Sequence, residues 1–123
     1  MSDACYCDYD MPSAFSETNP TARKPHRCYE CGRRIEAGEK YSRVWGIWDG
    51  RMDTHGTCSH CCALRDYVKS HVPCFCWAYG DMRNEARETL ASYSGELPGL
   101  WFGGMRLYVA ATKILRAQLK VKL

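Results

Sequence analysis

Cys28-Tyr29-Glu30-Cys31 and Cys58-Ser59-His60-Cys61 are two C-x2-C pairs, and the residues between them have the pattern of a β-hairpin. Four soft thiolates at this spacing suit Zn2+ far better than a hard cation such as Mg2+. A quartet made only of cysteines also leaves no open coordination position for a catalytic water. We therefore expect Cys28, Cys31, Cys58 and Cys61 to hold a zinc ion that builds the fold rather than one that runs a reaction.

The segment between the pairs predicts a tight turn followed by a hairpin. Gly32 comes directly after the first pair and can take the positive φ that a thiolate-lined knuckle needs. Residues 40–48 are rich in Tyr, Val, Trp and Ile, which favour a strand. Asp49-Gly50 suits a two-residue hairpin turn, and residues 51–57 are long enough for the returning strand.

The second pair is expected to open a helix over residues 58–71. This stretch contains good helix formers, and four of its larger side chains recur at spacings of three and four: Leu64, Tyr67, Val68 and His71. The positive end of a helix dipole favours thiolates in the first turn. A knuckle, a hairpin and a helix that carries the last two ligands resemble the treble-clef zinc finger.

Two C-x-C pairs, Cys5-Tyr6-Cys7 and Cys74-Phe75-Cys76, lie outside the quartet. In an extended chain the side chains at i and i+2 project to the same side, so each pair looks like half of a second four-thiolate zinc site. Such a site would join the N-terminal arm to the segment that follows the first helix. A mixed site that uses His26 or His71, a disulfide, and free thiols are the alternatives.

Cys62 brings the number of cysteines to nine. We expect it to be a small buried hydrophobe, and the alternative is that it replaces Cys58 as a ligand, since the two lie one helical turn apart. The odd count, the metal-type spacing and the lack of a basic start with an apolar run argue against a secreted disulfide scaffold. No run approaches the length of a membrane span. We expect a reduced, cytoplasmic protein.

The length of the chain suits one domain with a modest core, here residues 1–123. Within it we expect an irregular N-terminal arm over 1–27, a treble-clef zinc module over 28–76 and C-terminal helices over 81–123. Asp81 is the expected N-cap of a helix that ends near Tyr93, and a last helix begins near Leu100. Its expected core face consists of Met105, Tyr108, Val109, Thr112, Leu115 and Leu119. The predicted fold class is α+β, a zinc-stabilised treble clef followed by two further α-helices.

Charge is spread unevenly along the chain. The formal net charge is +3, but two four-thiolate zinc sites would each bring two negative charges and lower it to about −1. Basic residues nevertheless gather at two places: Arg23, Lys24, Arg27, Arg33 and Arg34 near the first pair, and Arg106, Lys113 and Lys120 every seven residues along the last helix. The alternative for the helix is an ordinary solvated face.

Two binding functions compete. The first is recognition of a protein or nucleoprotein partner through Arg43, Trp45, Trp48 and Arg51 of the hairpin, because Trp and Arg dominate interface hot spots. The basic face of the last helix would contribute to the same recognition. The second is direct binding of nucleic acid, with aromatic rings stacked on bases and basic groups on phosphates, and the near-zero charge with zinc bound weakens it.

An enzyme is the third possibility. Asp53-Thr54-His55 invites comparison with the HNH-type nucleases, which also use a treble-clef-like frame with a general-base His on the hairpin. Only Gly56 and Thr57 separate His55 from Cys58, so the long loop with an Asn that holds the catalytic metal in that family is missing. We therefore expect no catalysis and no small-molecule substrate.

Several short motifs together resemble a group of small zinc-finger proteins encoded by bacteriophages and prophages, over about the first 80 residues. They are Cys5-x-Cys7-Asp8-Tyr9, Pro25-His26-Arg27-Cys28-x-Glu30-Cys31-Gly32-Arg33, Ile35-x-x-Gly38-Glu39-x-Tyr41 and Thr57-Cys58-x-His60-Cys61-x-x-Leu64-Arg65-Asp66. The resemblance implies a phage accessory protein that binds host machinery in the bacterial cytoplasm, a class that includes anti-defence proteins that block CRISPR complexes. Residues 100–123 lie outside these motifs and are where we expect target specificity.

Overall fold

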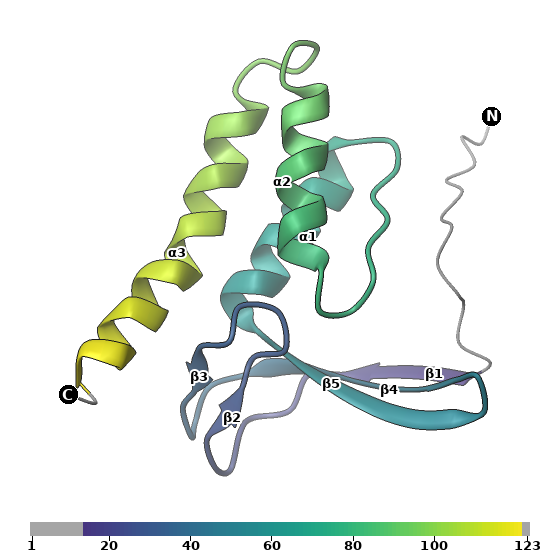
Figure 1. Cartoon of the computed structure of the whole chain (residues 1–123), viewed down its shortest axis with the longest axis vertical. Coiled ribbons are helices and arrows are strands. Elements are labelled where there is room, and N and C mark those ends of the chain that lie inside the picture. The colour runs from purple at the N-terminus through teal and green to yellow at the C-terminus, as the bar shows by residue number, and fades with distance from the viewer. Residues whose placement is uncertain (1–13, 122–123) are drawn as a thin grey trace.

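The computed structural model describes residues 14–121, with side chains up to Leu119, and the protein has the predicted α+β class (Figure 1). Three helices gather on one side of a set of antiparallel strands. The elements in chain order are β1 (Ala14–Thr18), β2 (His26–Arg27), β3 (Arg34–Ile35), β4 (Tyr41–Trp48), β5 (Arg51–Cys58), α1 (Ser59–His71), α2 (Met82–Tyr93) and α3 (Leu100–Val121). None of these helices combines the length and the apolar character that crossing a bilayer requires.

The predicted hairpin is confirmed. Strands β4 and β5 pair antiparallel from Trp48 opposite Arg51 to Tyr41 opposite Cys58. Asp49 and Gly50 connect them with φ values of 52° and 75°, the left-handed conformation that a two-residue hairpin turn requires. The register therefore delivers Cys58 to the end of the sheet where helix α1 begins.

The prediction of an irregular arm over residues 1–27 is wrong for residues 14–18, which form β1 at the edge of the sheet beside β4. The strand falls between Pro12 and Pro20, which bracket a stretch without a helix or turn signal. Glu17 ties it down, because its carboxylate accepts a hydrogen bond from Ser42 at 2.6 Å and pairs with Arg65 of α1 at 3.3 Å. Ser42 and Arg65 are distant from Glu17 in sequence, so no local sequence pattern predicts the strand.

The core lies among the three helices and the knuckle that β2 and β3 form. Its buried members include Ile35, Leu64, Val68, Met82, Leu90 and Ala111. The predicted helices at residues 82–93 and from Leu100 are confirmed, although the core face of α3 differs from the prediction. Val109 and Leu119 are 37% and 54% exposed, whereas Gly104 and Ala111 are buried. Helix α3 thus meets its neighbours through Leu100, Gly104 and Ala111. Of the predicted stripe, Tyr108 packs against the core, whereas Val109 and Leu119 face solvent.

Gly104 sets how closely α3 approaches α2. A Cβ at this position would lie 2.5 Å from Cδ1 of Leu90, which is itself fully buried and has little room to move. At the preceding position in the helix, a Cβ on Gly103 would collide with the hydroxyl of Tyr67. That hydroxyl donates to the carbonyl of Leu100 at 3.2 Å, which fixes it in place. The two glycines therefore permit the close crossing of α3 with α1 and α2.

We predict that Gly104→Ala lowers the free energy of unfolding by about 1–2 kcal/mol, because overpacking against Leu90 outweighs the gain in helix propensity of about 1 kcal/mol. Gly95→Ala is the matched control, since a Cβ there would meet nothing within 4 Å. Denaturant unfolding of both variants measures the difference. A Gly104→Ala protein as stable as the Gly95→Ala protein would contradict the role given to this glycine.

Candidate metal centre

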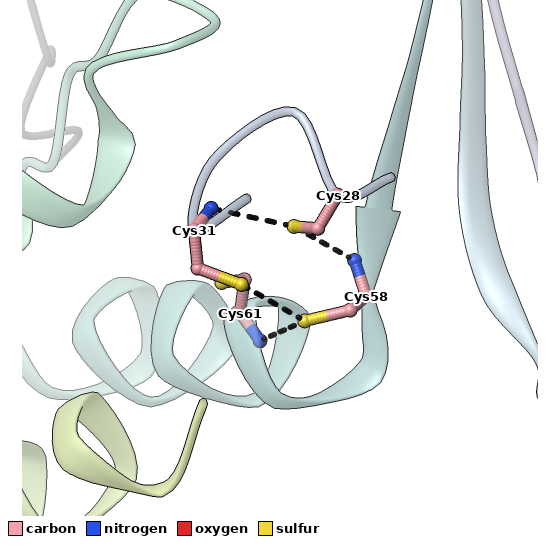
Figure 2. A group of neighbouring side chains, drawn as sticks. All are labelled: Cys28, Cys31, Cys58 and Cys61. Carbon is pink, nitrogen blue, oxygen red and sulfur yellow. Dashed lines mark hydrogen bonds between the residues drawn. The ribbon is translucent and has the colours of Figure 1, made fainter. Parts of the chain in front are cut away.

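Three local structures bring four cysteines together. Cys28 and Cys31 line the turn between β2 and β3, Cys58 ends β5, and Cys61 lies in the first turn of α1 (Figure 2). Their sulfurs all lie within 4.8 Å of one another. This is the quartet that the two C-x2-C pairs predicted, and among residues 14–121 it is the one such group of metal-ligating side chains.

The spacing of the sulfurs fits a tetrahedral ion. Cys31 Sγ and Cys58 Sγ are 3.8 Å apart. Zn–S bonds of about 2.3 Å at tetrahedral angles require about 3.8 Å between ligand sulfurs. Cys28, Cys58 and Cys61 are buried and Cys31 is half-buried. The quartet therefore matches a closed structural site in donor type, number, spacing and burial.

Backbone amides around the quartet favour ionised sulfurs. The amides of Cys31 and Cys58 point at Cys28 Sγ from 3.5 and 3.3 Å, and the amide of Cys61 points at Cys58 Sγ from 3.5 Å (Figure 2). Gly32 takes φ +80°, as predicted, and lets the knuckle turn tightly enough to aim its amides inward. Donation to a sulfur stabilises the thiolate, which is the form that binds metal.

Arg33 supplies a buried positive charge next to the quartet. Only 2% of its surface is exposed, and its guanidinium donates to Glu39 at 2.8 Å. Burial alone lowers the pKa of Arg33, but Glu39 and the sulfur of Cys58 outweigh it and raise the pKa. The buried Nε of Arg33 has no hydrogen-bond partner of its own. A buried cation with a spare donor beside Cys58 fits a site that carries negative charge.

Arg83 of α2 supplies a second positive charge. Its Nη1 donates to Cys61 Sγ at 3.7 Å, and its Nη2 donates to the Tyr108 carbonyl and to Thr112 Oγ1, both at 2.9 Å. Its guanidinium also lies over the ring of Tyr108 at 4.1 Å. Four thiolates and one Zn2+ carry a formal charge of about −2, which Arg83 reduces and to which Arg33, shared with Glu39, also contributes. Sequence reasoning missed both arginines in this role, and for Arg83 no local signal exists.

Without a metal the four thiols share protons unequally. A hydrogen bond from Cys31 lowers the pKa of Cys28 to about 6, and one from Cys28 holds the pKa of Cys58 below its usual range. Hydrogen bonds with Cys28 and with the other quartet sulfurs raise the pKa of Cys31 and of Cys61. A zinc ion must displace the protons of Cys31 and Cys61, so zinc affinity falls as the solution becomes more acidic.

The fold and the site together are consistent with a zinc-finger-like protein, a small α+β chain with one cysteine quartet that can bind a metal. No protein-family model, no curated protein and no solved structure matches the chain. The function of the chain must therefore be inferred from its own residues.

The structure describes only half of the predicted second zinc site, the pair Cys74 and Cys76. Cys5 and Cys7 lie outside the described residues. Cys74 and Cys76 are half-buried, their sulfurs lie 3.6 Å apart, and Phe75 between them is buried, as expected for an extended C-x-C pair. Both are disulfide-bonded in this structure, unlike the four quartet cysteines and Cys62, which are free.

Cys62 is not part of the quartet, so the alternative in which it replaces Cys58 is wrong. The half-buried Cys62 thiol donates to the Thr57 carbonyl at 3.7 Å. Burial raises its pKa to about 11. It is a protonated, unreactive packing residue, close to the predicted small hydrophobe.

The hairpin residues predicted to bind a partner do not form one surface. Arg43 and Arg51 are exposed and Trp45 is half-buried. Trp48 packs inward, with its ring 5.5 Å from His55 and 5.9 Å from Tyr79. Because side chains alternate along β4, Arg43 and Trp45 share one face of the sheet and Trp48 lies on the other.

The predicted residues of the last helix are partly placed. Arg106 and Lys113 are exposed on α3. Lys120 also belongs to α3, but its side chain lies outside the described part. The predicted basic cluster near the first pair does not act as one unpaired patch, because two of its members form ion pairs: Arg33 with Glu39 and Arg34 with Glu36.

Glu30 caps helix α2, a role the sequence assigned to Asp81. Asp81 occupies the N-cap position, but its side chain makes no cap hydrogen bond. Instead, the Glu30 carboxylate accepts from the amides of Gly80 at 2.9 Å and Met82 at 3.0 Å. Burial raises the pKa of Glu30 despite these two bonds. The knuckle thus holds the start of α2 in place across a long sequence separation.

Gln118 fastens α3 to the knuckle. Its Oε1 accepts from the amide of Arg34 at 2.6 Å, and its Nε2 donates to the carbonyl of the same residue at 2.8 Å. This pairing satisfies both backbone groups of a residue in β3. It places the C-terminal part of α3 against the structure that carries Cys28 and Cys31.

We predict that Cys61→Ser abolishes zinc binding and cooperative unfolding, whereas Cys62→Ser changes neither. A structural zinc contributes about 10 kcal/mol or more of folding free energy, which is comparable to the whole stability of a small domain. The two positions are adjacent in α1, and only Cys61 belongs to the quartet. Zinc content and thermal melting of both purified variants test this. A Cys61→Ser protein that keeps its zinc and its melt would contradict the assignment.

Proposed function

We propose that the chain is a non-catalytic binding module of treble-clef type, in which a zinc ion held by Cys28, Cys31, Cys58 and Cys61 stabilises the fold. The observation that carries the proposal is the order of the ligands. Two come from a knuckle, one from the end of the hairpin and one from the first turn of the following helix. This order supports the treble-clef arrangement that the sequence resembles.

The surroundings of the histidines near the quartet support a non-catalytic role. His55, the residue that invites comparison with a nuclease base, is 6% exposed and lies among the rings of Tyr29, Trp48 and Tyr79. His60 Nδ1 lies 3.4 Å from the guanidinium of Arg33. These contacts support packing as the role of the His55 ring and hydrogen bonding to Arg33 as the role of the His60 ring.

The outer face of α3 supports a binding role. It exposes Phe102, Arg106, Val109, Lys113 and Arg116, with Phe102 78% exposed, and α3 contains no acidic residue. A face that combines exposed apolar side chains with unopposed positive charge suits an acidic partner surface. We infer that the partner is a host protein or nucleoprotein complex. The phage origin and the anti-defence role remain implied by the sequence resemblance.

If α3 binds the partner, Arg106→Glu combined with Lys113→Glu removes most of that binding while zinc content and melting temperature stay unchanged. Affinity capture from a bacterial lysate, quantified by mass spectrometry, compares this variant with the wild-type protein. Lys40→Glu combined with Arg87→Glu is the matched control, because it makes the same change in charge at two exposed positions outside α3. Equal losses from both variants, or from neither, would exclude α3 as the binding face.

Direct binding of nucleic acid is the second candidate, and a basic cleft beside β4 favours it. A catalytic function finds no comparable support among residues 14–121, where the quartet is the one group that could hold a metal.

We further propose that Cys74 and Cys76 complete a second zinc site with Cys5 and Cys7. Their sulfur separation of 3.6 Å is close to the value of about 3.8 Å for two thiolates on one zinc ion. Native mass spectrometry of protein purified under reducing conditions is expected to show two zinc ions per chain. One zinc ion, together with cysteines that resist alkylation until a strong reductant is added, would instead assign the pair to disulfides.

A further inference from the structure

A basic cleft lies between the outer face of β4 and the connection from β1 to β2. It has a volume of about 710 Å3, and its lining includes Thr18, Thr21, Arg23, Lys24, His26 and Arg43. Among the described residues that line it, none is acidic. Arginine, lysine and hydroxyl side chains around one hollow are the donors that bind phosphate.

The positive charge in this cleft is not neutralised within the described residues 14–121. Arg23, Lys24 and Arg43 form no ion pair there. The carboxylates near them in sequence are committed elsewhere, since Glu17 pairs with Arg65 and Glu39 pairs with Arg33. The cleft therefore attracts an anion from outside the chain.

The wall of the cleft is held in shape by backbone hydrogen bonds. The amide of Ala22 donates to the Glu39 carbonyl at 2.8 Å, and the amide of Gly38 donates to the Ala22 carbonyl at 2.8 Å. The amide of Tyr41 donates to the Pro20 carbonyl at 3.2 Å. These bonds fix the segment that carries Arg23 and Lys24 beside β4, so a ligand meets a formed site and little ordering is needed on binding.

An aromatic ring continues the cleft along the sheet. Trp45 is two residues from Arg43 on the same face of β4, about 7 Å along the strand. Its neighbours in register are Ser16 on β1 and Thr54 on β5, both small and exposed. The indole of Trp45 is half-buried, so part of it is exposed on this face. The spacing from Arg43 to Trp45 is one that the phosphate and the base of a single nucleotide can bridge.

We propose that this face binds single-stranded nucleic acid, with a phosphate held by Arg23, Lys24 and Arg43 and a neighbouring base stacked on Trp45. Positively charged grooves beside aromatic platforms are how proteins bind single strands without sequence preference. The indole beside the cleft favours this ligand over a phosphorylated or acidic peptide, which has no base to stack. The proposal deepens the second candidate function, and it depends on the zinc module only for a folded sheet.

The test is fluorescence anisotropy with a labelled oligothymidylate of about 12 nucleotides at low salt, a length within the usual site sizes. Arg23→Glu combined with Arg43→Glu is expected to weaken binding at least tenfold. Lys69→Glu combined with Arg87→Glu makes the same change in charge at exposed positions outside the cleft and outside α3, and it is expected to weaken binding less than threefold. Arg106→Glu combined with Lys113→Glu tests α3 as the rival site. Affinity should fall with salt at a logarithmic slope of about −0.7, as neutralisation of one phosphate on a single strand predicts.

Trp45→Ala is expected to weaken binding about 5- to 150-fold, the range for loss of one stacked base. Zinc content and melting temperature show whether this variant folds. If it does not, Trp45→Phe replaces it. That variant should retain binding and lose most of the oligonucleotide-induced quenching of tryptophan fluorescence.

Three outcomes overturn the proposal. Zinc-loaded protein that shows no binding at low salt excludes nucleic acid and leaves the zinc-module proposal, with its α3-dependent capture, intact. Loss of binding from the α3 variant but not from the cleft variant moves the site to α3. A phosphopeptide that competes as well as unlabelled oligonucleotide assigns the cleft to phosphate on a protein.

Discussion

The burial of four sulfurs in one cluster is the constraint on which the rest of this structure depends. Thiolates this close repel one another and lose their hydration, so the cluster is stable only with a compensating dication and further positive charge. Zn2+ would be the dication. Arg33 and Arg83 lie beside the sulfurs and provide the further positive charge. Backbone amides of the knuckle and of α1 add donors to the sulfurs. The quartet is thus an electrostatic centre whose parts come from the knuckle, β5, α1 and α2.

Hydrogen bonds also connect the residues around the quartet to the C-terminal helices α2 and α3. Arg83 joins Cys61 to Tyr108 and Thr112 of α3, and Glu30, between two ligands, caps α2. Gln118 pairs with the backbone of the knuckle from the far end of α3. Although residues 100–123 lie outside the cysteine motifs, α3 is attached to the structure around the quartet at two points. Loss of the metal would therefore disturb the position of α3 and its exposed face as well as the four ligands.

Local patterns predicted most of the secondary structure and the quartet itself. The Asp49-Gly50 turn, the spacing of Cys28 and Cys31, and the periodicity from Cys58 to His71 each lie within a short window, so sequence alone was sufficient. Strand β1, the cap supplied by Glu30 and the charge supplied by Arg83 depend on partners far along the chain. The cleft shows the same limit, because Arg43 joins Arg23 and Lys24 only after β4 pairs and the preceding connection folds over it. Trp48 turned inward because the face of β4 that carries it packs against His55 and Tyr79, which no alternation pattern identifies.

The central claim is that zinc binding to the quartet and folding of the chain are coupled, so that neither occurs without the other. The most direct measurement is a titration of the purified protein with a zinc chelator, in which zinc content and near-ultraviolet circular dichroism are recorded on the same samples. The account predicts that the tertiary signal disappears in step with the quartet zinc and returns when zinc is added back. A tertiary signal that survives complete removal of zinc would contradict it.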